Sequence, residues 1–157
     1  MTTRGWRPSA GYFKAVNGVV RLLLRSPLHS LLSGRLMLLT YEGSRTGRTY
    51  AIPVAYYRWT EDEVWAFGAR TGWVSNFRTP HTVHLRIRGK KVQAEASAVE
   101  DQNEVADLLE ELIARNGPSP AQDPFLGLPH DRQPTRDEAL EAATQARIAR
   151  FRLEHSL

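Results

Sequence analysis

Five short segments of β-branched, aromatic or alternating apolar residues follow one another between residues 36 and 96, and they constrain the fold most. They lie at residues 36–40, 50–59, 64–67, 82–87 and 92–96. Segment 82–87 alternates apolar and polar side chains, as a half-buried strand does, and Gly89 lies in the short turn behind it. Strands this close together, with short connections, predict an antiparallel meander that forms a β-barrel or a β-sandwich.

Two segments that flank the β region have the apolar spacing of helices. Residues 11–25 carry apolar side chains on one side and basic ones mainly on the other, so this helix packs on its own domain or lies on a membrane surface. Residues 102–115 repeat apolar side chains at helical spacing. Asp101 precedes them as an N-cap, with Glu104 three positions later, which completes the start signal of a helix.

The C-terminal part of the chain is predicted to be a loop followed by a helix. Residues 118–134 contain five prolines and no helical or strand pattern. Thr135 and Glu138 then have the spacing of a capping box, which predicts an alanine-rich helix that extends to about Leu153. The fold class expected from all these segments is mainly β (α+β), with helices before, within and after the β region.

Length and composition predict a single domain made of three regions. These are an N-terminal helical region at 1–34, a β core with its following helix at 35–115, and the proline-rich loop and C-terminal helix at 116–157. The chain contains no cysteine, which excludes disulfides, a thiolate nucleophile and Cys-ligated metals. Its apolar runs are shorter than the ~20 residues that a membrane helix needs. We therefore expect a cytoplasmic protein that is attached at most to a membrane surface.

The net charge of +4 comes mainly from arginine, the side chain best suited to forked recognition of phosphate or carboxylate. Four basic residues gather on the hairpin around Gly89: Arg86, Arg88, Lys90 and Lys91. This hairpin favours a solvated surface, with nucleic-acid binding as the alternative. No metal site is expected, because His81 and His84 differ by an odd number and face opposite sides of a strand.

Residues 43–48 (Gly-Ser-Arg-Thr-Gly-Arg) connect the first two predicted strands and have the composition of an anion site. Glycines that adopt positive φ allow neighbouring backbone N–H groups to converge into a nest for an anion. Arg45 and Arg48 add charge, and Ser44 and Thr46 add hydroxyl donors. The loop is not a P-loop, because its spacing differs and no helix follows. The alternative is a surface turn that carries incidental arginines.

Residues 72–78 (Gly-Trp-Val-Ser-Asn-Phe-Arg), between the third and fourth predicted strands, form a second candidate site. Trp73 and Phe77 are four positions apart and share a face if the segment is helical. Asn76 and Arg78 would then point towards a ligand. The alternative is that the two rings close one end of a barrel.

These two segments resemble the deazaflavin-dependent nitroreductases, which have a split β-barrel fold related to flavin-binding oxidases. The first match covers residues 38–54, with a Leu-Thr strand, a Gly-rich basic loop and a Pro-hydrophobic strand. The second covers residues 73–78 and the strand that follows. The resemblance extends over about residues 28–114 and implies an antiparallel split β-barrel with helices packed around it, a fold that often forms homodimers.

The resemblance also implies which residues bind the cofactor, coenzyme F420. The Gly-rich loop would hold its phosphate-bearing tail, two strands would flank the deazaflavin ring, and the second segment would close the pocket. The residues implied are Ser44, Arg45, Thr46, Gly47, Arg48, Pro53, Val54, Phe67, Gly68, Ala69, Trp73 and Asn76. The loop lacks the basic residue usual at Ser44, and Tyr50 replaces an arginine, so Arg45 and Arg48 are expected to supply most of the charge.

The function that the resemblance implies is transfer of a hydride from the reduced deazaflavin to a quinone-like, nitroaromatic or enone acceptor. The cofactor carries this chemistry, so no catalytic side chain is assigned, and the protein positions the cofactor and excludes water. Two alternatives remain open: the same barrel binding FMN, and a non-catalytic carrier of a cofactor or an anionic lipid. The expected partner is a small-molecule acceptor.

Overall fold

The computed structural model describes residues 36–117, 127–129 and 131–157. The predicted helix at 11–25 and most of the proline-rich loop lie outside these residues. The described elements are β1 (Leu36–Glu42), β2 (Thr49–Ala55), β3 (Tyr57–Thr60), β4 (Glu63–Ala69), the 3-10 helix η2 (Trp73–Phe77), β5 (His81–Ile87), β6 (Lys90–Val99), α2 (Gln102–Asn116), α3 (Arg136–Gln145) and β7 (Ala146–Leu153).

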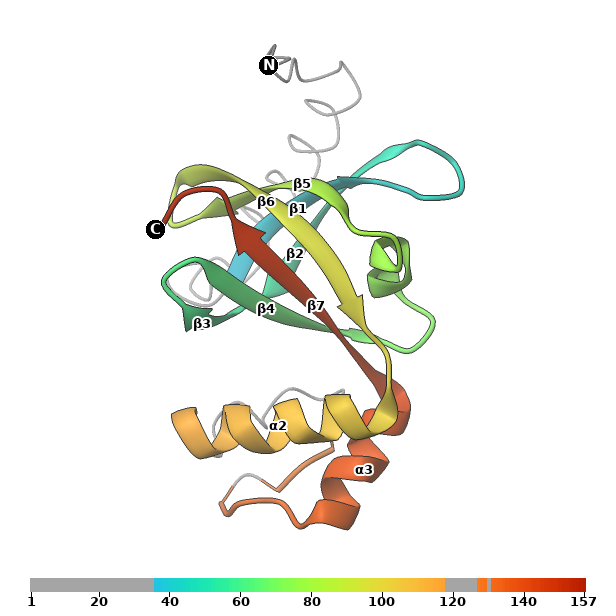
Figure 1. Ribbon diagram of the computed structural model, residues 1–157, viewed down its shortest axis with the longest axis vertical. Coiled ribbons are helices and arrows are strands. Elements are labelled where there is room, and N and C mark those ends of the chain that lie inside the picture. The colour runs from blue at the N-terminus through green and yellow to red at the C-terminus, as the bar shows by residue number, and fades with distance from the viewer. Residues whose placement is uncertain (1–35, 118–126, 130) are drawn as a thin grey trace, which may run out of the picture.

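The strands form one seven-stranded antiparallel sheet in the order β2-β1-β5-β6-β7-β4-β3. The sheet curls, so that β2 and β4, which lie near opposite ends of this order, contact each other (Figure 1). The expected mainly β fold and the antiparallel split barrel are confirmed. The predicted turn at Gly89 is confirmed as well, with φ of +49° at Arg88 and +78° at Gly89.

Two sequence predictions about the elements are wrong. Segment 50–59 forms two strands, β2 and β3, because the chain leaves the ladder at Tyr56, whose side chain is buried in the barrel. The alanine-rich helix ends at Gln145, and residues 146–153 form β7 instead of continuing to Leu153 as a helix. β7 lies between β6 and β4, where both of its edges form hydrogen-bonded ladders. This pairing outweighs the helical preference of alanine, which is a weak local term.

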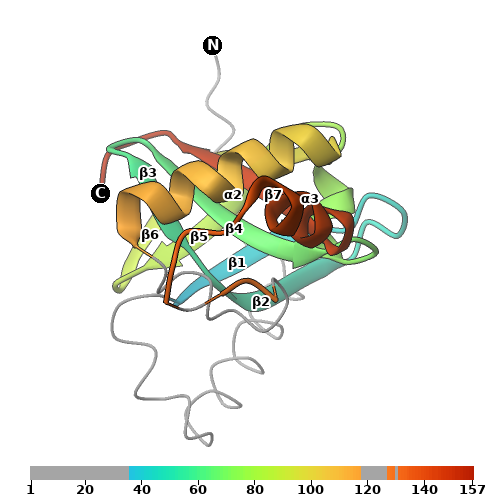
Figure 2. The same cartoon turned by 90° about the horizontal axis from the view of Figure 1, so that it is seen from below.

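The two faces of the sheet bury two separate hydrophobic clusters. The inner cluster fills the barrel and includes Leu39, Leu85, Phe77 and Phe151. The outer cluster lies beneath α2 and α3, where Trp65 and Ile148 meet Leu109 and Ala143. Figure 2 shows α2 and α3 together on this side of the sheet. α2 and α3 therefore cover the part of the outer surface that β4 and β7 form.

The helix starts agree with the capping prediction. The Asp101 side chain accepts a hydrogen bond from the Glu104 backbone N–H at 2.9 Å, and the Thr135 hydroxyl accepts one from the Glu138 N–H at 3.2 Å. These bonds satisfy N–H groups that a helix leaves free at its first turn. The caps fix where α2 and α3 begin on the outer face.

An aromatic clamp attaches α2 to the edge of the sheet. The rings of Trp59 and Trp65 stack with centroids 3.7 Å apart, and the guanidinium of Arg115 lies 3.9 Å above the Trp59 ring. The same arginine donates to the Trp59 carbonyl at 3.3 Å. Stacked rings and a cation over an aromatic face are both stabilising, so the clamp of Trp59, Trp65 and Arg115 holds α2 on β3 and β4.

Candidate functional site

The loop at residues 43–48 is a compact turn between β1 and β2. The Gly43 N–H donates to the Arg48 carbonyl at 2.8 Å, and the Gly47 N–H donates to the Gly43 carbonyl at 2.9 Å. Gly47 has a φ of +66°, a conformation that favours glycine. Arg45 and Arg48 are exposed on this turn, where neither forms an ion pair with another described residue.

Much of the predicted N–H nest is used within the protein itself. Besides Gly43 and Gly47, the Arg48 N–H donates to the Thr46 hydroxyl at 3.3 Å, and the Ser44 N–H donates to a side chain of η2. Within the described residues, the N–H groups of Arg45 and Thr46 have no acceptor. The donors that remain for an anion are therefore the N–H groups of Arg45 and Thr46, the Thr46 hydroxyl, which only accepts in the contact with Arg48, and the guanidinium groups of Arg45 and Arg48.

The two candidate segments meet through one pair of residues. The Ser44 N–H and hydroxyl both donate to Asn76 Oδ1, at 3.0 Å and 3.2 Å. The Asn76 amide in turn donates to the Trp73 carbonyl at 2.8 Å. Figure 1 shows the β1–β2 loop and the segment that holds η2 on the same side of the barrel. Asn76 thus joins the basic loop to η2, although the two are far apart in the sequence.

Trp73 and Phe77 share a face, as predicted, and close the barrel at this end. Their rings meet edge to face with centroids 5.9 Å apart, and both pack against Phe151. Phe77 is fully buried, whereas Trp73 is half-buried. Arg78 turns away from the loop and pairs with Glu100 at 2.9 Å. The structure therefore places the rings in the core and Asn76 at the surface of the candidate site.

The Phe77 ring also begins an aromatic row that leads to the loop. Tyr41 contacts Phe77 edge to face at 5.4 Å, and Tyr50 stacks on Tyr41 at 5.5 Å. Burial raises the pKa of the Tyr41 hydroxyl, and Tyr50 beside it acts in the same direction. Tyr50 is exposed and packs so closely on Gly43 that a Cβ there would lie 2.8 Å from the tyrosine ring. The row supports the base of the loop from inside the barrel.

The strand residues predicted to flank a ring do not all face the same space. On β2, Pro53 is exposed, while Val54 is buried in the inner cluster. On β4, Phe67 packs against Tyr57 on the outer side, with centroids 5.4 Å apart, and Ala69 is exposed. Ala69 nevertheless adjoins η2, because its carbonyl accepts a hydrogen bond from the N–H of Gly72, the N-cap of η2, at 2.9 Å.

At Gly68 the backbone is closely approached by two side chains of the protein itself, those of Val74 and Trp73. A Cβ at Gly68 would lie 2.6 Å from Val74 Cγ2 and 3.1 Å from Trp73 Nε1. The predicted close approach of a deazaflavin ring to this position therefore competes with the packing of η2 on β4. The packing alone is sufficient to require glycine here.

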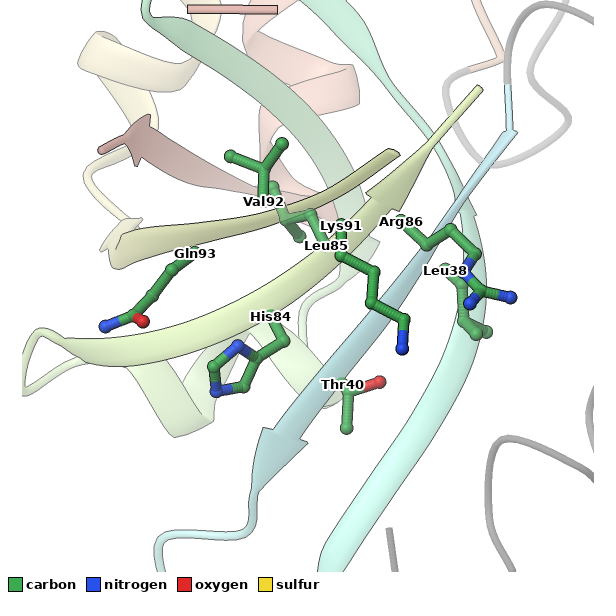
Figure 3. Close-up of a pocket in the computed structure, with 8 residues that line it drawn as sticks. All are labelled: Leu38, Thr40, His84, Leu85, Arg86, Lys91, Val92 and Gln93. Atoms are coloured by element: carbon green, nitrogen blue, oxygen red, sulfur yellow. The ribbon is translucent and has the colours of Figure 1, made fainter. Parts of the chain in front are cut away.

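A pocket on the outer face of β1, β5 and β6 contains polar groups that the sequence analysis did not combine into a site. It has a volume of about 220 Å³ and is lined by Leu38, Thr40, His84, Leu85, Arg86, Lys91, Val92 and Gln93 (Figure 3). Burial lowers the pKa of His84, and the nearby Glu154 acts against this shift more weakly. The alternation of apolar and polar residues in the two hairpin strands indicates which side chains share the outer face. Which of them lie opposite one another depends on the strand register, which the sequence does not give.

Among the residues that the structure describes, no three acidic, histidine or cysteine side chains are placed to hold a metal ion. None of the described helices has the length and apolar character of a membrane span.

Comparison with known proteins identifies the family. The family model described as F420H(2)-dependent quinone reductase matches residues 24–121, which is more than half of the chain. This match includes the basic loop, η2 and the pocket strands. The chain therefore belongs to the F420H(2)-dependent quinone reductase family. Membership places it among the deazaflavin-dependent reductases, whose cofactor is F420, and this confirms the class of oxidoreductase and the cofactor expected from the sequence.

Solved structures resemble the chain only distantly. A protein of unknown function from Agrobacterium tumefaciens, Atu2129, has 16% identity and a TM-score of 0.49, over 81% of this chain and 52% of its own. The chain thus spans about half the length of that protein. An FMN/FAD-binding general stress protein from Xanthomonas citri has 10% identity and a TM-score of 0.42, over 82% of this chain and 84% of its own. A protein described as an F420 reductase has 15% identity and a TM-score of 0.42, over 83% of this chain and 95% of its own. No curated protein shows a significant sequence match.

Proposed function

We propose that this protein transfers a hydride from reduced F420 to a quinone-like acceptor, with nitroaromatic and enone compounds as further acceptors. When bound, the cofactor supplies the hydride, and a proton from water completes the reduction of a quinone to its hydroquinone. The chain itself binds and orients the two reactants and limits the access of water. The observation that carries this proposal is the joining of the basic loop to η2 through Ser44 and Asn76.

The donor set of the loop fits a phosphate. Arg45 and Arg48 present guanidinium groups that have no acidic partner among the described residues, and the N–H groups of Arg45 and Thr46 have no acceptor there. Charge-assisted hydrogen bonds from arginine and backbone N–H groups are those that proteins use for phosphate. Asn76 holds the loop in this conformation through Ser44, so we assign Asn76 a positioning role.

We place the deazaflavin ring near Pro53 on β2 and Ala69 on β4, both of which are exposed. Val54, Phe67 and Gly68 would support these strands rather than present side chains to the ring, because their surroundings are other residues of the protein. Trp73, half-buried beside Gly68, would limit the site on the side of η2.

The proposal is tested by titrating the purified protein with F420 and following the deazaflavin fluorescence. Arg45→Ala and Arg48→Ala should each weaken binding by about 1–3 kcal/mol, the value of a charge-assisted contact. Arg58→Ala, which removes an exposed charge from β3 at the far edge of the sheet, is the matched control and should leave binding unchanged. Unchanged affinity in both loop variants would remove the loop from the site.

Turnover with a panel of acceptors then tests the reaction. Oxidation of reduced F420 should accelerate with a quinone such as menadione, and the nitroaromatic and enone compounds rank the acceptor classes. Binding of F420 without reduction of any acceptor would instead support a carrier. Saturable binding of FMN alone would overturn the proposed cofactor.

A further inference from the structure

The pocket on β1, β5 and β6 places two cations directly opposite each other. Arg86 on β5 is the register partner of Lys91 on β6, so both side chains leave the same face of the sheet. Like charges at directly opposed positions repel and destabilise a sheet. Among the described residues, no carboxylate pairs with Arg86 or Lys91. Both side chains are exposed, so solvent screens part of this repulsion, and an anion between them would replace the repulsion by two attractive contacts.

The next row of the same face adds groups that can donate hydrogen bonds. Thr40, His84 and Gln93 are register partners across β1, β5 and β6. Thr40 is only 4% exposed, which is unusual for a polar residue on the outside of a barrel. Figure 3 shows the amino end of Lys91 near Thr40, with the Arg86 guanidinium beside Leu38 and the His84 ring on the opposite side of Thr40. The pocket therefore combines two positive charges with a hydroxyl, an imidazole and an amide.

The volume of the pocket limits the size of the ligand that it can bind. Sites for drug-sized ligands occupy roughly 300–1,000 Å³, whereas this cavity has about 220 Å³. A small molecule, or one substituent of a larger molecule, fits such a volume. The planar fork of Arg86 suits the two oxygens of a carboxylate, and Leu38 provides an apolar wall beside it.

We propose that this pocket binds the carboxylate of a small organic acid or of a larger ligand, between Arg86 and Lys91. The site is separate from the loop at residues 43–48, but it lies on the same face as Pro53, because Leu38 is the register partner of both Pro53 and Arg86. A carboxylate here belongs either to the bound cofactor or to an acidic acceptor that reacts beside it. The choice between the cofactor and an acceptor as the source of the carboxylate rests on the proposed function, whereas carboxylate binding itself does not.

The pocket is tested first without any cofactor, by calorimetric or NMR titration with benzoate and its neutral analogue benzamide. Benzoate should bind the full-length protein, and benzamide should bind at least about tenfold more weakly, because it lacks the charge. Lys91→Gln and Arg86→Gln should each weaken benzoate binding about five- to tenfold. Lys90→Gln is the matched control: it removes the same charge from the neighbouring position, which does not line the pocket, and should bind benzoate as the wild type does.

Two results would overturn the pocket proposal. One is equal binding of benzoate and benzamide, and the other is an equal loss of benzoate binding in Lys90→Gln and Lys91→Gln, which would indicate a general charge effect. Thermal unfolding of each variant shows whether it is folded. These measurements need no F420. Carboxylate binding in the pocket can therefore be confirmed even if hydride transfer is disproved, and hydride transfer can be confirmed even if the pocket binds no carboxylate.

The source of the carboxylate follows from two further measurements on the same variants. If the cofactor supplies it, Lys91→Gln weakens F420 binding and leaves the discrimination between acidic and neutral acceptors unchanged. If an acceptor supplies it, Lys91→Gln raises the KM of a carboxylated quinone and leaves both F420 binding and the KM of menadione unchanged. Absence of all these effects in Lys91→Gln and Arg86→Gln would overturn a role of the pocket in the reaction.

Discussion

Ser44 donates two hydrogen bonds to Asn76 Oδ1, from its backbone N–H at 3.0 Å and from its hydroxyl at 3.2 Å, across 32 positions of sequence. Asn76→Ala removes the acceptor of both bonds and should weaken F420 binding by about 1–2 kcal/mol. Ser44→Ala keeps the N–H bond and should have the smaller effect. Asn76→Asp adds a negative charge at the base of the loop, so it should weaken binding more than Asn76→Ala if the loop holds a phosphate. Fluorescence titration at two salt concentrations measures all three.

Gly47 and Gly89 offer a matched pair of substitutions. Both glycines have positive φ, +66° and +78°, and a Cβ at either would meet no atom within 4 Å. Gly47→Ala and Gly89→Ala should therefore each lower the free energy of unfolding by about 1–2 kcal/mol, the cost of the left-handed conformation. Only Gly47→Ala should also weaken F420 binding. Equal effects of the two variants on binding would contradict a specific role of the loop at residues 43–48.

Gly68→Ala tests the packing of η2 on β4. The new methyl group would lie 2.6 Å from Val74 Cγ2, so Val74 and Trp73 must move. Overpacking of this kind typically costs about 1–3 kcal/mol of the free energy of unfolding. Denaturant unfolding measures this cost, and Trp73 fluorescence should shift as its surroundings change. A variant as stable as the wild type would show that η2 can separate from β4 at little cost.

His84 should make the stability of the protein sensitive to acid. Burial lowers the pKa of His84 in the folded state below its ordinary value of 6.5, so the unfolded chain binds the proton at higher pH than the folded chain does. Stability contributed by neutral His84 is then complete above about pH 6.5 and falls as the pH decreases below it. His84→Gln should reduce this loss in thermal unfolding between pH 7 and pH 5. His155→Gln, at an exposed position near the C-terminus, is the control and should retain it.

The aromatic clamp of Trp59, Trp65 and Arg115 should contribute to the attachment of α2. Arg115→Ala removes the cation above the Trp59 ring and should lower the free energy of unfolding by about 0.5–1 kcal/mol, the value at an exposed site. Arg115→Lys keeps the charge but loses the planar stacking and the fork, so it should recover only part of the loss. An Arg115→Ala variant without any change in unfolding would show that the stacked tryptophans suffice.

Local signals identify much of this fold from the sequence. The alternation at residues 82–87, the turn at Gly89 and the Asp101 cap each depend on neighbours within a few positions, so pattern and spacing are sufficient to predict them. The loop at residues 43–48 is recognisable for the same reason. Its internal hydrogen bonds are not, because they depend on how the turn closes and on the distant Asn76.

The features that the sequence does not predict depend on pairing between strands that are distant in the sequence. Residues 146–153 have the alanine content of a helix, and only the space between β6 and β4 makes them a strand. Pro53 and Val54 face opposite sides of β2 because successive residues of a strand alternate. Which of the two sides is buried depends on how the whole sheet closes into a barrel. The pocket requires the register of three strands, since Thr40, His84 and Gln93 are not close in sequence.

The central position of β7 has a consequence for how the chain folds. Glu63 on β4 and Arg150 on β7 form an ion pair across 87 positions, and every contact between β4 and β7 spans a similar separation. Within the described sheet, β7 provides the hydrogen-bonded connection between β6 and β4, so one edge of each of these two strands stays unpaired until residues 146–153 join them. Because contacts of such separation slow folding, the joining of β4 and β6 through β7 should be a late step, and Trp73, which packs on Phe151 of β7, reaches its final surroundings only then.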